Sequence, residues 1–368
     1  MLKNRPMYFV LTTSSIWQLC HESFADQPWA ASPRLEIPDG EQHKTLATVE
    51  QIWHFLFAHH ATRDDILVCV GGGVICDLGG FAASTYKRGM PHLNVPTTLL
   101  AMVDAASGGK TGFDYAGMKN AIGTYAQPLD TLVIPSLIAT LPPRELLSGY
   151  GEMLKHALLD TPDHWHQLLR LDLETEAGVQ ALMPLIARSR AVKARIVHAD
   201  PHEHGLRRAL NLGHTVGHAL EAQMLANGHP APHGYCVVWG MVAALYLSIL
   251  HTEEPPISLA CSGAQVLACP GAQASPPAAK SLLKGDLEGL SSLREVLRQL
   301  EQVMLRYYGR PVCNCKDQSQ LLALMQQDKK NTAAGIRFTL LRQIGDPLTD
   351  ETPSPKSLAA ALDYLFSI

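Results

Sequence analysis

The chain has 368 residues, of which 46% are hydrophobic and 17% charged, and its formal net charge is −4. This composition is typical of a folded globular protein, and it excludes a disordered chain and a strongly basic surface for nucleic acid. The length favours two domains, and the net charge favours a small-molecule ligand. Because there is no apolar run of eighteen residues and no signal-peptide pattern, we expect a cytoplasmic protein without a membrane span.

The first third of the chain alternates strand and helix patterns. Strand patterns at 7–11 and 65–70 flank a helical pattern at 46–60, and short apolar runs at 92–98 and 130–135 suggest further strands. The strand at 65–70 runs directly into glycines and then into another helix. This order predicts a parallel α/β domain.

After residue 141 the pattern becomes mainly helical. We expect an α/β domain over residues 1–140, followed by an α-helical domain over 141–368. Two segments depart from this pattern: residues 252–285 are rich in Pro, Ala, Ser and Gly, as in a surface insertion, and 335–341 form a late strand pattern. A closing helix is expected at 356–368. The main helical patterns of the second domain are 180–198, 208–224, 236–250, 287–307 and 318–327.

The eight cysteines are scattered along the chain. The one close pair, Cys313 and Cys315, is spaced neither as a redox CxxC motif nor as a zinc ribbon. Reduced and mostly buried thiols are therefore expected.

Three glycines follow the strand at 65–70 in the sequence VCVGGGVICDLGG. Without side chains, Gly72 and Gly73 would let backbone amides and a helix N-terminus approach a pyrophosphate, although the same residues also suit a plain tight turn. Thr97 and Thr98 add hydroxyl groups at the end of another strand, where ligands bind in open α/β sheets.

Residues 102–125 form a glycine-rich stretch that carries Asp104, Lys110, Lys119 and Asn120. Lysines among glycines suit an anionic ligand, and the alternative is ordinary surface lysines. Further on, Glu152 and Lys155 share one face of a predicted helix, where an exposed salt bridge is the alternative to a functional pair.

The stretch LNLGHTVGHALE places His214 and His218 four residues apart in a helical pattern. Helical spacing puts Arg207 and Asn211 on the same face, so the four residues would form a polar stripe. Two histidines do not make a metal site, and a pair of core histidines is the alternative.

A third ligand could come from His229 or His233, and Glu152 could add a carboxylate. Two imidazoles and one carboxylate with an open position are typical of a catalytic metal site.

Eight sequence blocks, in this order, resemble the 3-dehydroquinate synthase family across essentially the whole chain. The blocks are IPDGEQHKTL, GGGVICDLGGFAASTYKRG, VPTTLLAMVDAASGGKTG, GMKNAIGTYAQP, RELLSGYGEMLKHALL, GLRRALNLGHTVGHALE, HGYCVVWGM and DKKNTAAGIRFTLL. The resemblance implies a homodimer with a Rossmann-like N-terminal domain, an all-α metal-binding C-terminal domain, bound NAD and one divalent metal, zinc or cobalt.

The resemblance also implies roles for individual residues. The metal ligands would be Glu152, His214 and His233. The NAD contacts would be Asp39, Glu41, Lys44, Gly72, Gly73, Asp77, Thr97, Thr98, Asp104, Lys110, Lys119 and Thr140. The substrate contacts would be Arg88, Lys110, Asn120, Lys155, Lys193, Arg207, Asn211, His218 and a lysine of DKKN, which we place at Lys329.

The implied reaction belongs to the shikimate pathway and converts 3-deoxy-D-arabino-heptulosonate 7-phosphate to 3-dehydroquinate and phosphate. It proceeds by transient oxidation with NAD, β-elimination, re-reduction and an intramolecular aldol closure. Rival functions are another sugar phosphate cyclase and a metal-dependent alcohol or glycerol dehydrogenase. The chain departs from the family pattern at Cys76, where a glycine is usual, in a slightly longer path from His214 to His233, and in the insertion at 252–285.

Overall fold

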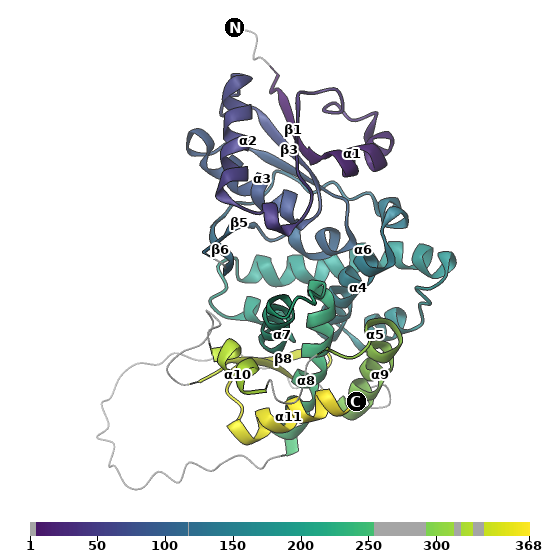
Figure 1. The fold of residues 1–368 in the computed structure, drawn as a ribbon. Helices are drawn as coiled ribbons and strands as arrows, with labels where there is room; N and C mark the ends of the chain where they lie inside the picture. The colour runs from purple at the N-terminus through teal and green to yellow at the C-terminus, as the bar shows by residue number, and fades with distance from the viewer. Residues whose placement is uncertain (1–4, 117, 254–291, 313–317, 327–334) are drawn as a thin grey trace, which may run out of the picture.

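The computed structural model describes residues 5–116, 118–253, 292–312, 318–326 and 335–368 (Figure 1). The insertion beyond Glu253, Lys329 and the Cys313–Cys315 pair lie outside the described residues. The cysteines within them, Cys20, Cys69, Cys76 and Cys236, are free and buried, as predicted.

The N-terminal domain is built on a four-stranded parallel sheet with the strand order β2-β1-β3-β4. This confirms the parallel α/β prediction, whereas the run at 130–135 forms only a single bridge between Asn94 and Thr131. The run ends at Pro135, which begins a 3₁₀ helix and has no N–H group with which to continue a ladder. The strands are β1 (Tyr8–Thr13), β2 (Arg34–Ile37), β3 (Ile66–Gly71) and β4 (His92–Pro96).

The two faces of this sheet pack against different partners. Alternation along β1 and β3 sends Phe9 and Leu67 into a cluster that includes Ile52 of α2, while Val10 and Val68 face the opposite way. That second face belongs to the same continuous core as the helices of the C-terminal half. The two halves of the described chain therefore share one hydrophobic core. The helices on the first face are α2 (Leu46–Ala58) and α3 (Gly73–Thr85).

The C-terminal half is mainly helical, as predicted, and lies below the sheet in Figure 1. The late strand pattern forms a two-stranded antiparallel hairpin, so this half is not entirely α-helical. The helices of this half are α4 (Pro143–Leu158), α5 (Pro162–Leu169), α6 (Glu176–Ala199), α7 (His214–Ala226), α8 (His233–Glu253), α9 (Leu293–Val303), α10 (Gln318–Gln326) and α11 (Pro355–Ser367), and its hairpin strands are β7 (Phe338–Gln343) and β8 (Asp346–Glu351). The N-terminal half also contains α1 (Ser14–Cys20) and the strands β5 (Lys110–Tyr115) and β6 (Met118–Tyr125).

Helix α8 is apolar over most of its length. Among the described residues it is the one helix that is long and apolar enough to cross a membrane, and 78% of its apolar window is buried inside the molecule. Its contacts with α4, α7, α9 and α11 account for this composition, because a central core helix must be apolar on all sides.

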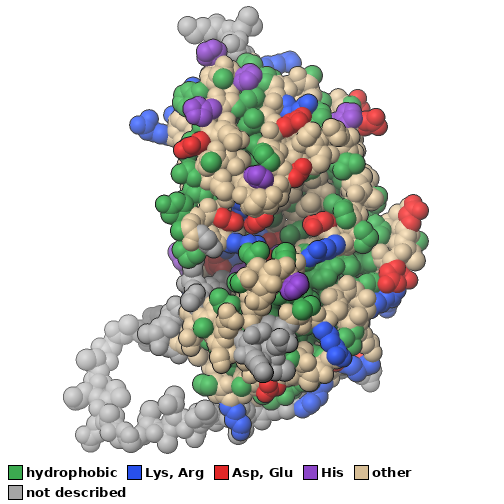
Figure 2. All heavy atoms as spheres, viewed as in Figure 1, with side chains coloured by type: hydrophobic (Ala, Val, Ile, Leu, Met, Phe, Trp, Pro, Cys, Tyr) green, Lys and Arg blue, Asp and Glu red, His purple; other side chains and the backbone are tan. Residues whose placement is uncertain are grey.

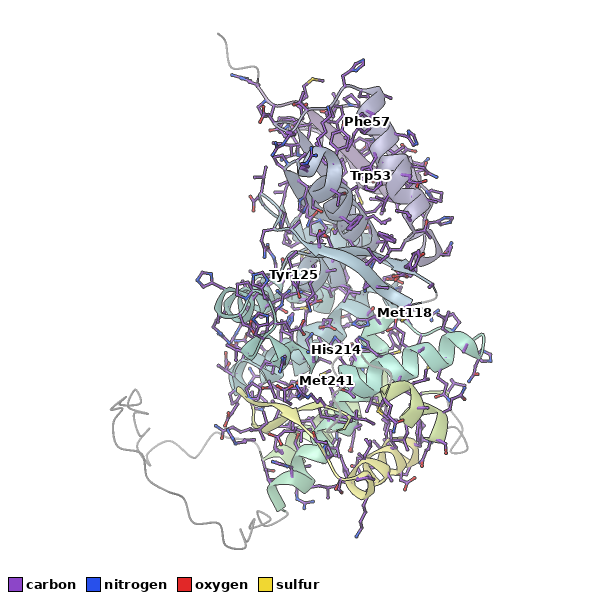
Figure 3. The ribbon with its side chains drawn as sticks, turned by 90° about the vertical axis from the view of Figure 1, so that its left-hand side faces the viewer. Trp53, Phe57, Met118, Tyr125, His214 and Met241 are labelled. Atoms are coloured by element: carbon purple, nitrogen blue, oxygen red, sulfur yellow. The ribbon has the colours of Figure 1, made fainter. Side chains whose placement is uncertain are left out.

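The predicted continuous helix over 208–224 is wrong, because the chain breaks at Gly213. Residues Leu206–Asn211 form a short 3₁₀ helix, Gly213 adopts a φ of +78°, and α7 begins at His214. A Cβ atom on Gly213 would lie 2.6 Å from Cγ of Met241 and 2.7 Å from the carbonyl oxygen of Val237. Figure 3 places Met241 close to His214. Close packing of α7 on α8 therefore requires glycine here, and Arg207 and Asn211 do not share a helix with His214 and His218.

Substitution Gly213→Ala should therefore destabilise the fold more than a positive φ alone explains. A left-handed backbone costs a non-glycine residue about 1–2 kcal/mol, and the contact with α8 should add about 1–3 kcal/mol. Gly228 offers a matched control, because its φ is +76° and no atom lies within 4 Å of its added Cβ. Urea unfolding followed by circular dichroism should show a larger loss for Gly213→Ala than for Gly228→Ala. Equal losses would contradict the packing argument.

Candidate active site

Three helices of the C-terminal half bring a carboxylate and two imidazoles together. Glu152 of α4 is fully buried, and its Oε1 lies 3.6 Å from Nε2 of His214 and 3.3 Å from Nε2 of His233. The other oxygen, Oε2, pairs with the buried ammonium of Lys155. Neither carboxylate oxygen forms a hydrogen bond of good geometry, which is costly for a buried polar group.

The two imidazole rings are held from behind. Nδ1 of His214 lies 3.1 Å from the carbonyl oxygen of Leu212, and Nδ1 of His233 lies 3.2 Å from the carboxylate of Glu221. Such partners at Nδ1 leave Nε2 free to bind a cation, as in many metal sites. The group Glu152, His214 and His233 therefore has the donor types and orientations of a divalent-metal site.

Burial and neighbouring charges set the protonation of this group. Burial, assisted by Lys155, holds the pKa of His214 well below its usual value. Burial alone would also lower the pKa of His233, but its contacts with Glu152 and Glu221 raise it to about 10. For Glu152, burial raises the pKa, but Lys155 and the histidines outweigh this and lower it. The site thus combines a neutral imidazole, a carboxylate and an imidazolium whose proton a metal ion could displace.

His218 lies beside this group, one turn along α7. The ligand atoms of His214, His218 and His233 all lie within 4.8 Å of one another, and the ring centres of His214 and His218 are 5.1 Å apart. His229 is exposed in the turn before α8 and is not part of the cluster. Of the two rivals for the third ligand, His233 is therefore the one that faces Glu152.

The loops expected to hold NAD meet at the carboxyl edge of the parallel sheet. Gly72 caps the N-terminus of α3, and β3 and β4 are in register at Gly71 and Pro96, so Thr97 and Thr98 follow at the same edge. A Cβ atom on Gly72 would lie 3.3 Å from Cγ2 of Thr98. This edge and a bare helix N-terminus are where nucleotides bind in such folds.

Other predicted NAD residues surround these loops. Asp39 follows β2 and accepts a hydrogen bond from Ser15, and Gly73 is the first residue of α3. Cys76 lies in the first helical turn of α3, not in the preceding loop, and is 2% exposed, so the fold accommodates this departure inside the core. Thr140 ends the 3₁₀ helix Pro135–Thr140, where its hydroxyl donates to Leu137.

Buried Lys44 contacts two other predicted residues. Lys44 is 4% exposed. Its Nζ lies 2.6 Å from Oδ2 of Asp77 and 2.6 Å from Oδ1 of Asn120. Burial raises the pKa of Asp77, although Lys44 opposes this effect. The structure thus places Asn120, which we expected at the substrate, beside two residues predicted to contact NAD.

A second charged group lies between the two halves. Nζ of Lys193 is 2.8 Å from Oδ1 of Asp104 and 2.6 Å from its carbonyl oxygen, and Asp104 also faces Nε2 of His156 at 3.7 Å. Arg207 is buried and donates from Nη2 to the carbonyl oxygen of Gly108 at 2.9 Å. A Cβ atom on Gly108 would lie 3.0 Å from that Nη2 and 3.3 Å from Cε of Lys193, so the two cations are neighbours.

Sequence reasoning missed Glu203. Its carboxylate pairs with Lys110 of β5 and accepts a hydrogen bond from Asn211 at 2.9 Å, so it bridges predicted substrate residues of the two halves. Glu203 also has a φ of +62°, an uncommon conformation for a non-glycine residue. Glu203 lies in a short loop between α6 and the next 3₁₀ helix, which gave no periodic signal from which this position could have been found.

Arg88, another predicted substrate residue, lies far from the proposed nucleotide loops. Arg88 is exposed at the far end of α3, and that helix of 13 residues is about 20 Å long, so Arg88 lies well away from Gly72. Figure 2 shows acidic and basic side chains gathered in a hollow at mid-height of the molecule.

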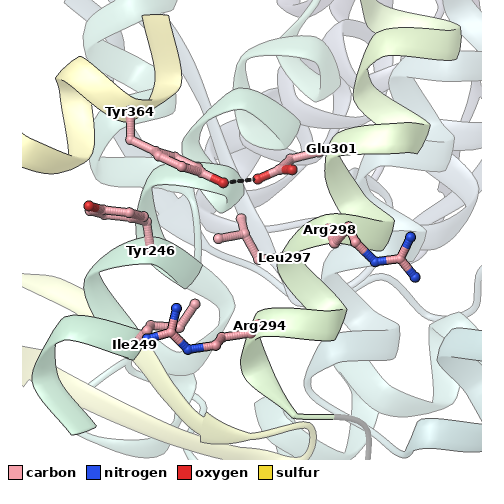
Figure 4. Close-up of a pocket in the computed structure, with 7 residues that line it drawn as sticks. All are labelled: Tyr246, Ile249, Arg294, Leu297, Arg298, Glu301 and Tyr364. Atoms are coloured by element: carbon pink, nitrogen blue, oxygen red, sulfur yellow. Dashed lines mark hydrogen bonds between the residues drawn. The ribbon is translucent and has the colours of Figure 1, made fainter. Parts of the chain in front are cut away.

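A separate cavity of about 240 Å³ lies between α8, α9 and α11 (Figure 4). Its Glu301 accepts a hydrogen bond from Tyr364, and its Arg298 pairs with Glu295 at 2.6 Å. It contains none of the predicted site residues, so it is not a candidate for the active site.

Comparisons with known proteins show the family to which the chain belongs. Residues 34–148 match the family model of the 3-dehydroquinate synthase N-terminal domain, and residues 149–264 match that of the C-terminal domain. The 3-dehydroquinate synthase of Parabacteroides distasonis is 34% identical over 357 residues, covering 97% of this chain and 90% of that protein. The same enzyme of Latilactobacillus sakei subsp. sakei is 42% identical over 320 residues, covering 87% and 77%.

Solved structures share the fold at lower identity. A 2-deoxy-scyllo-inosose synthase complexed with carbaglucose-6-phosphate, NAD⁺ and Co²⁺ aligns with a TM-score of 0.73 and 21% identity, covering 100% of this chain and 92% of that chain. The 2-epi-5-epi-valiolone synthase ValA of Streptomyces hygroscopicus subsp. jinggangensis, with NAD⁺ and Zn²⁺ bound, aligns with a TM-score of 0.72 and 23% identity, covering 98% and 91%. Since both family models match and the relatives span most of its length, the chain belongs to the 3-dehydroquinate synthase family.

Proposed function

We propose that this chain is a carbon–oxygen lyase that converts 3-deoxy-D-arabino-heptulosonate 7-phosphate to 3-dehydroquinate and phosphate, using NAD and one divalent metal ion. The observation that carries the proposal is the buried carboxylate of Glu152, which faces two imidazole Nε2 atoms beside a group of buried cations. A phosphate dianion and a carboxylate on the substrate would match those cations. Family membership supports the same reaction.

The residues present fit both cofactors. Glu152, His214 and His233 would hold the metal, because both imidazole Nε2 atoms face the buried carboxylate of Glu152, whose oxygens form no hydrogen bond of good geometry. The loops at Gly72 and Thr98, with Asp39, Asp77 and Lys44 around them, would hold NAD. When bound, NAD accepts and returns a hydride, and a zinc or cobalt ion acts as a Lewis acid on a substrate oxygen.

The chain itself would bind and orient the substrate. Lys193 and Arg207 lie side by side at Gly108 and would provide fixed positive charge for the phosphate, which must leave with its electron pair during β-elimination. Lys110 and Asn211, which both contact Glu203, and His218, which lies beside His214 and His233, would hold the open chain for the aldol closure. Lys155, Asn120, Arg88 and Lys329 remain proposed substrate contacts, and Glu41, Gly73, Thr97, Asp104, Lys119 and Thr140 remain proposed NAD contacts.

Two further properties are proposed from the family resemblance. We expect a homodimer that acts in the cytoplasm, as a soluble enzyme of aromatic amino acid biosynthesis would. Size-exclusion chromatography with light scattering would test the oligomeric state.

The proposed reaction is tested by supplying 3-deoxy-D-arabino-heptulosonate 7-phosphate with catalytic NAD and Co²⁺. We expect phosphate release in many-fold excess over NAD, without net NADH, and loss of activity on chelation. Stoichiometric NADH would indicate a dehydrogenase. Phosphate release from a different sugar phosphate alone would indicate another cyclase, and either result would overturn the proposal.

A further inference from the structure

We propose that Glu221 is a positioning residue that orients His233 for metal binding and is itself fixed by Lys119 from the other half of the molecule. The inference rests on the proposed function only in taking His233 as a metal ligand. Glu221 was not among the residues expected from the sequence.

Glu221 lies on α7 between two partners. One oxygen, Oε2, accepts from Nδ1 of His233 on α8 at 3.2 Å, and the other, Oε1, accepts from Nζ of Lys119 on β6 at 2.7 Å. The Glu221 side chain is 13% exposed, whereas that of Lys119 is 44% exposed. The carboxylate is thus nearly buried, and the lysine reaches it from the surface of the hairpin.

The contact with Glu221 orients the imidazole ring of His233. Because Nδ1 of His233 is held by Glu221, the ring presents Nε2 to Oε1 of Glu152 at 3.3 Å. A carboxylate behind a metal-binding imidazole fixes the ring and makes its free nitrogen a stronger donor.

The second contact crosses the junction between the two halves. Lys119 belongs to the β5–β6 hairpin, which packs on α3 of the N-terminal domain, while Glu221 and His233 belong to the helical half. Lys119 also faces Glu41 at 3.8 Å, near the loops proposed for NAD. The chain Lys119–Glu221–His233–Glu152 therefore links the edge of the proposed nucleotide site to the metal site.

The test measures Co²⁺ binding to the full-length, metal-free protein without NAD or substrate, by titration followed through the visible absorption of the bound ion. Relative to wild type, Glu221→Gln should bind Co²⁺ about 10-fold more weakly and Glu221→Ala up to about 100-fold more weakly. Their absorption spectra should also change, because the imidazole of His233 is no longer held in place. Glu145→Gln, on the exposed start of α4, is the matched control and should bind as wild type does.

The role of Lys119 is tested in the same titration. Lys119→Met should weaken Co²⁺ binding several-fold in the wild-type background and have no effect in the Glu221→Ala background, because the two residues act in series. Additive effects, or Glu221 variants with wild-type affinity and spectrum, would overturn the inference while leaving the proposed reaction intact. A wild-type protein that binds no Co²⁺ would overturn both. Urea unfolding of the metal-free variants separates ring orientation from a general loss of stability.

Discussion

Substitution Glu152→Gln should remove the metal site. The carboxylate provides the one negative charge among the proposed ligands and lies 3.3 Å and 3.6 Å from the two imidazole nitrogens. Loss of a residue that hydrogen-bonds to a metal ligand weakens metal binding by up to ~100-fold. Loss of the ligand Glu152 itself should weaken Co²⁺ or Zn²⁺ binding by more than this, and turnover should fall with it. Metal content after dialysis and titration with Co²⁺ measure the effect, and Glu145→Gln on the same helix provides the control.

The same substitution has a cost for stability that must be separated from metal loss. Lys155 is 1% exposed and pairs with Glu152, so Glu152→Gln alone leaves a buried ammonium group without its carboxylate. Breaking a buried pair from one side costs about 3–5 kcal/mol. The double variant Glu152→Gln/Lys155→Met should recover much of that stability but no metal binding. A stable double variant that still binds metal with wild-type affinity would refute the ligand assignment.

His214→Ala and His218→Ala should differ although both residues lie on one face of α7. His214 is 9% exposed, its ring is held by the Leu212 carbonyl oxygen, and its Nε2 faces Glu152. Its removal should lower metal affinity by at least ~100-fold, since removing even a residue that only hydrogen-bonds to a metal ligand can cost that much. His218→Ala should bind metal within a few-fold of wild type and lose turnover by about 10²-fold, the usual contribution of a positioned acid, base or charge.

The cluster of three histidines makes this comparison decisive. If His214, His218 and His233 bind the metal without Glu152, then His218→Ala will lose metal as completely as His214→Ala does, and the proposed division of roles fails. His229→Ala is the control, because His229 is exposed before α8 and lies outside the cluster. Metal content and turnover should be measured on the same preparations.

Local sequence patterns were sufficient for elements whose neighbours lie close in the chain. The buried strand β3, the glycines after it and the start of α3 follow from apolar runs and glycine placement alone. The pattern failed at Gly213, because helical periodicity continues through residues 208–224 while the need for glycine comes from Met241 and Val237 on another helix. The edge strand β2 was also missed, since four residues of alternating exposure give too short a signal.

The sequence by itself determined the family, the parallel α/β start, the helical second half and the identity of the candidate ligands. Only the tertiary structure decided which of those side chains contact one another. It shows His233, not His229, beside Glu152, and Asn120 in contact with Lys44. It also shows that Glu203 and Glu221 contact predicted site residues. Glu221 lies 69 positions from Glu152 along the chain and 102 from Lys119. Even so, the imidazole of His233 contacts both Glu221 and Glu152, and the ammonium group of Lys119 contacts Glu221 directly. Residue types and periodicity report on near neighbours, whereas a site between two halves depends on contacts that only packing of distant helices and strands creates.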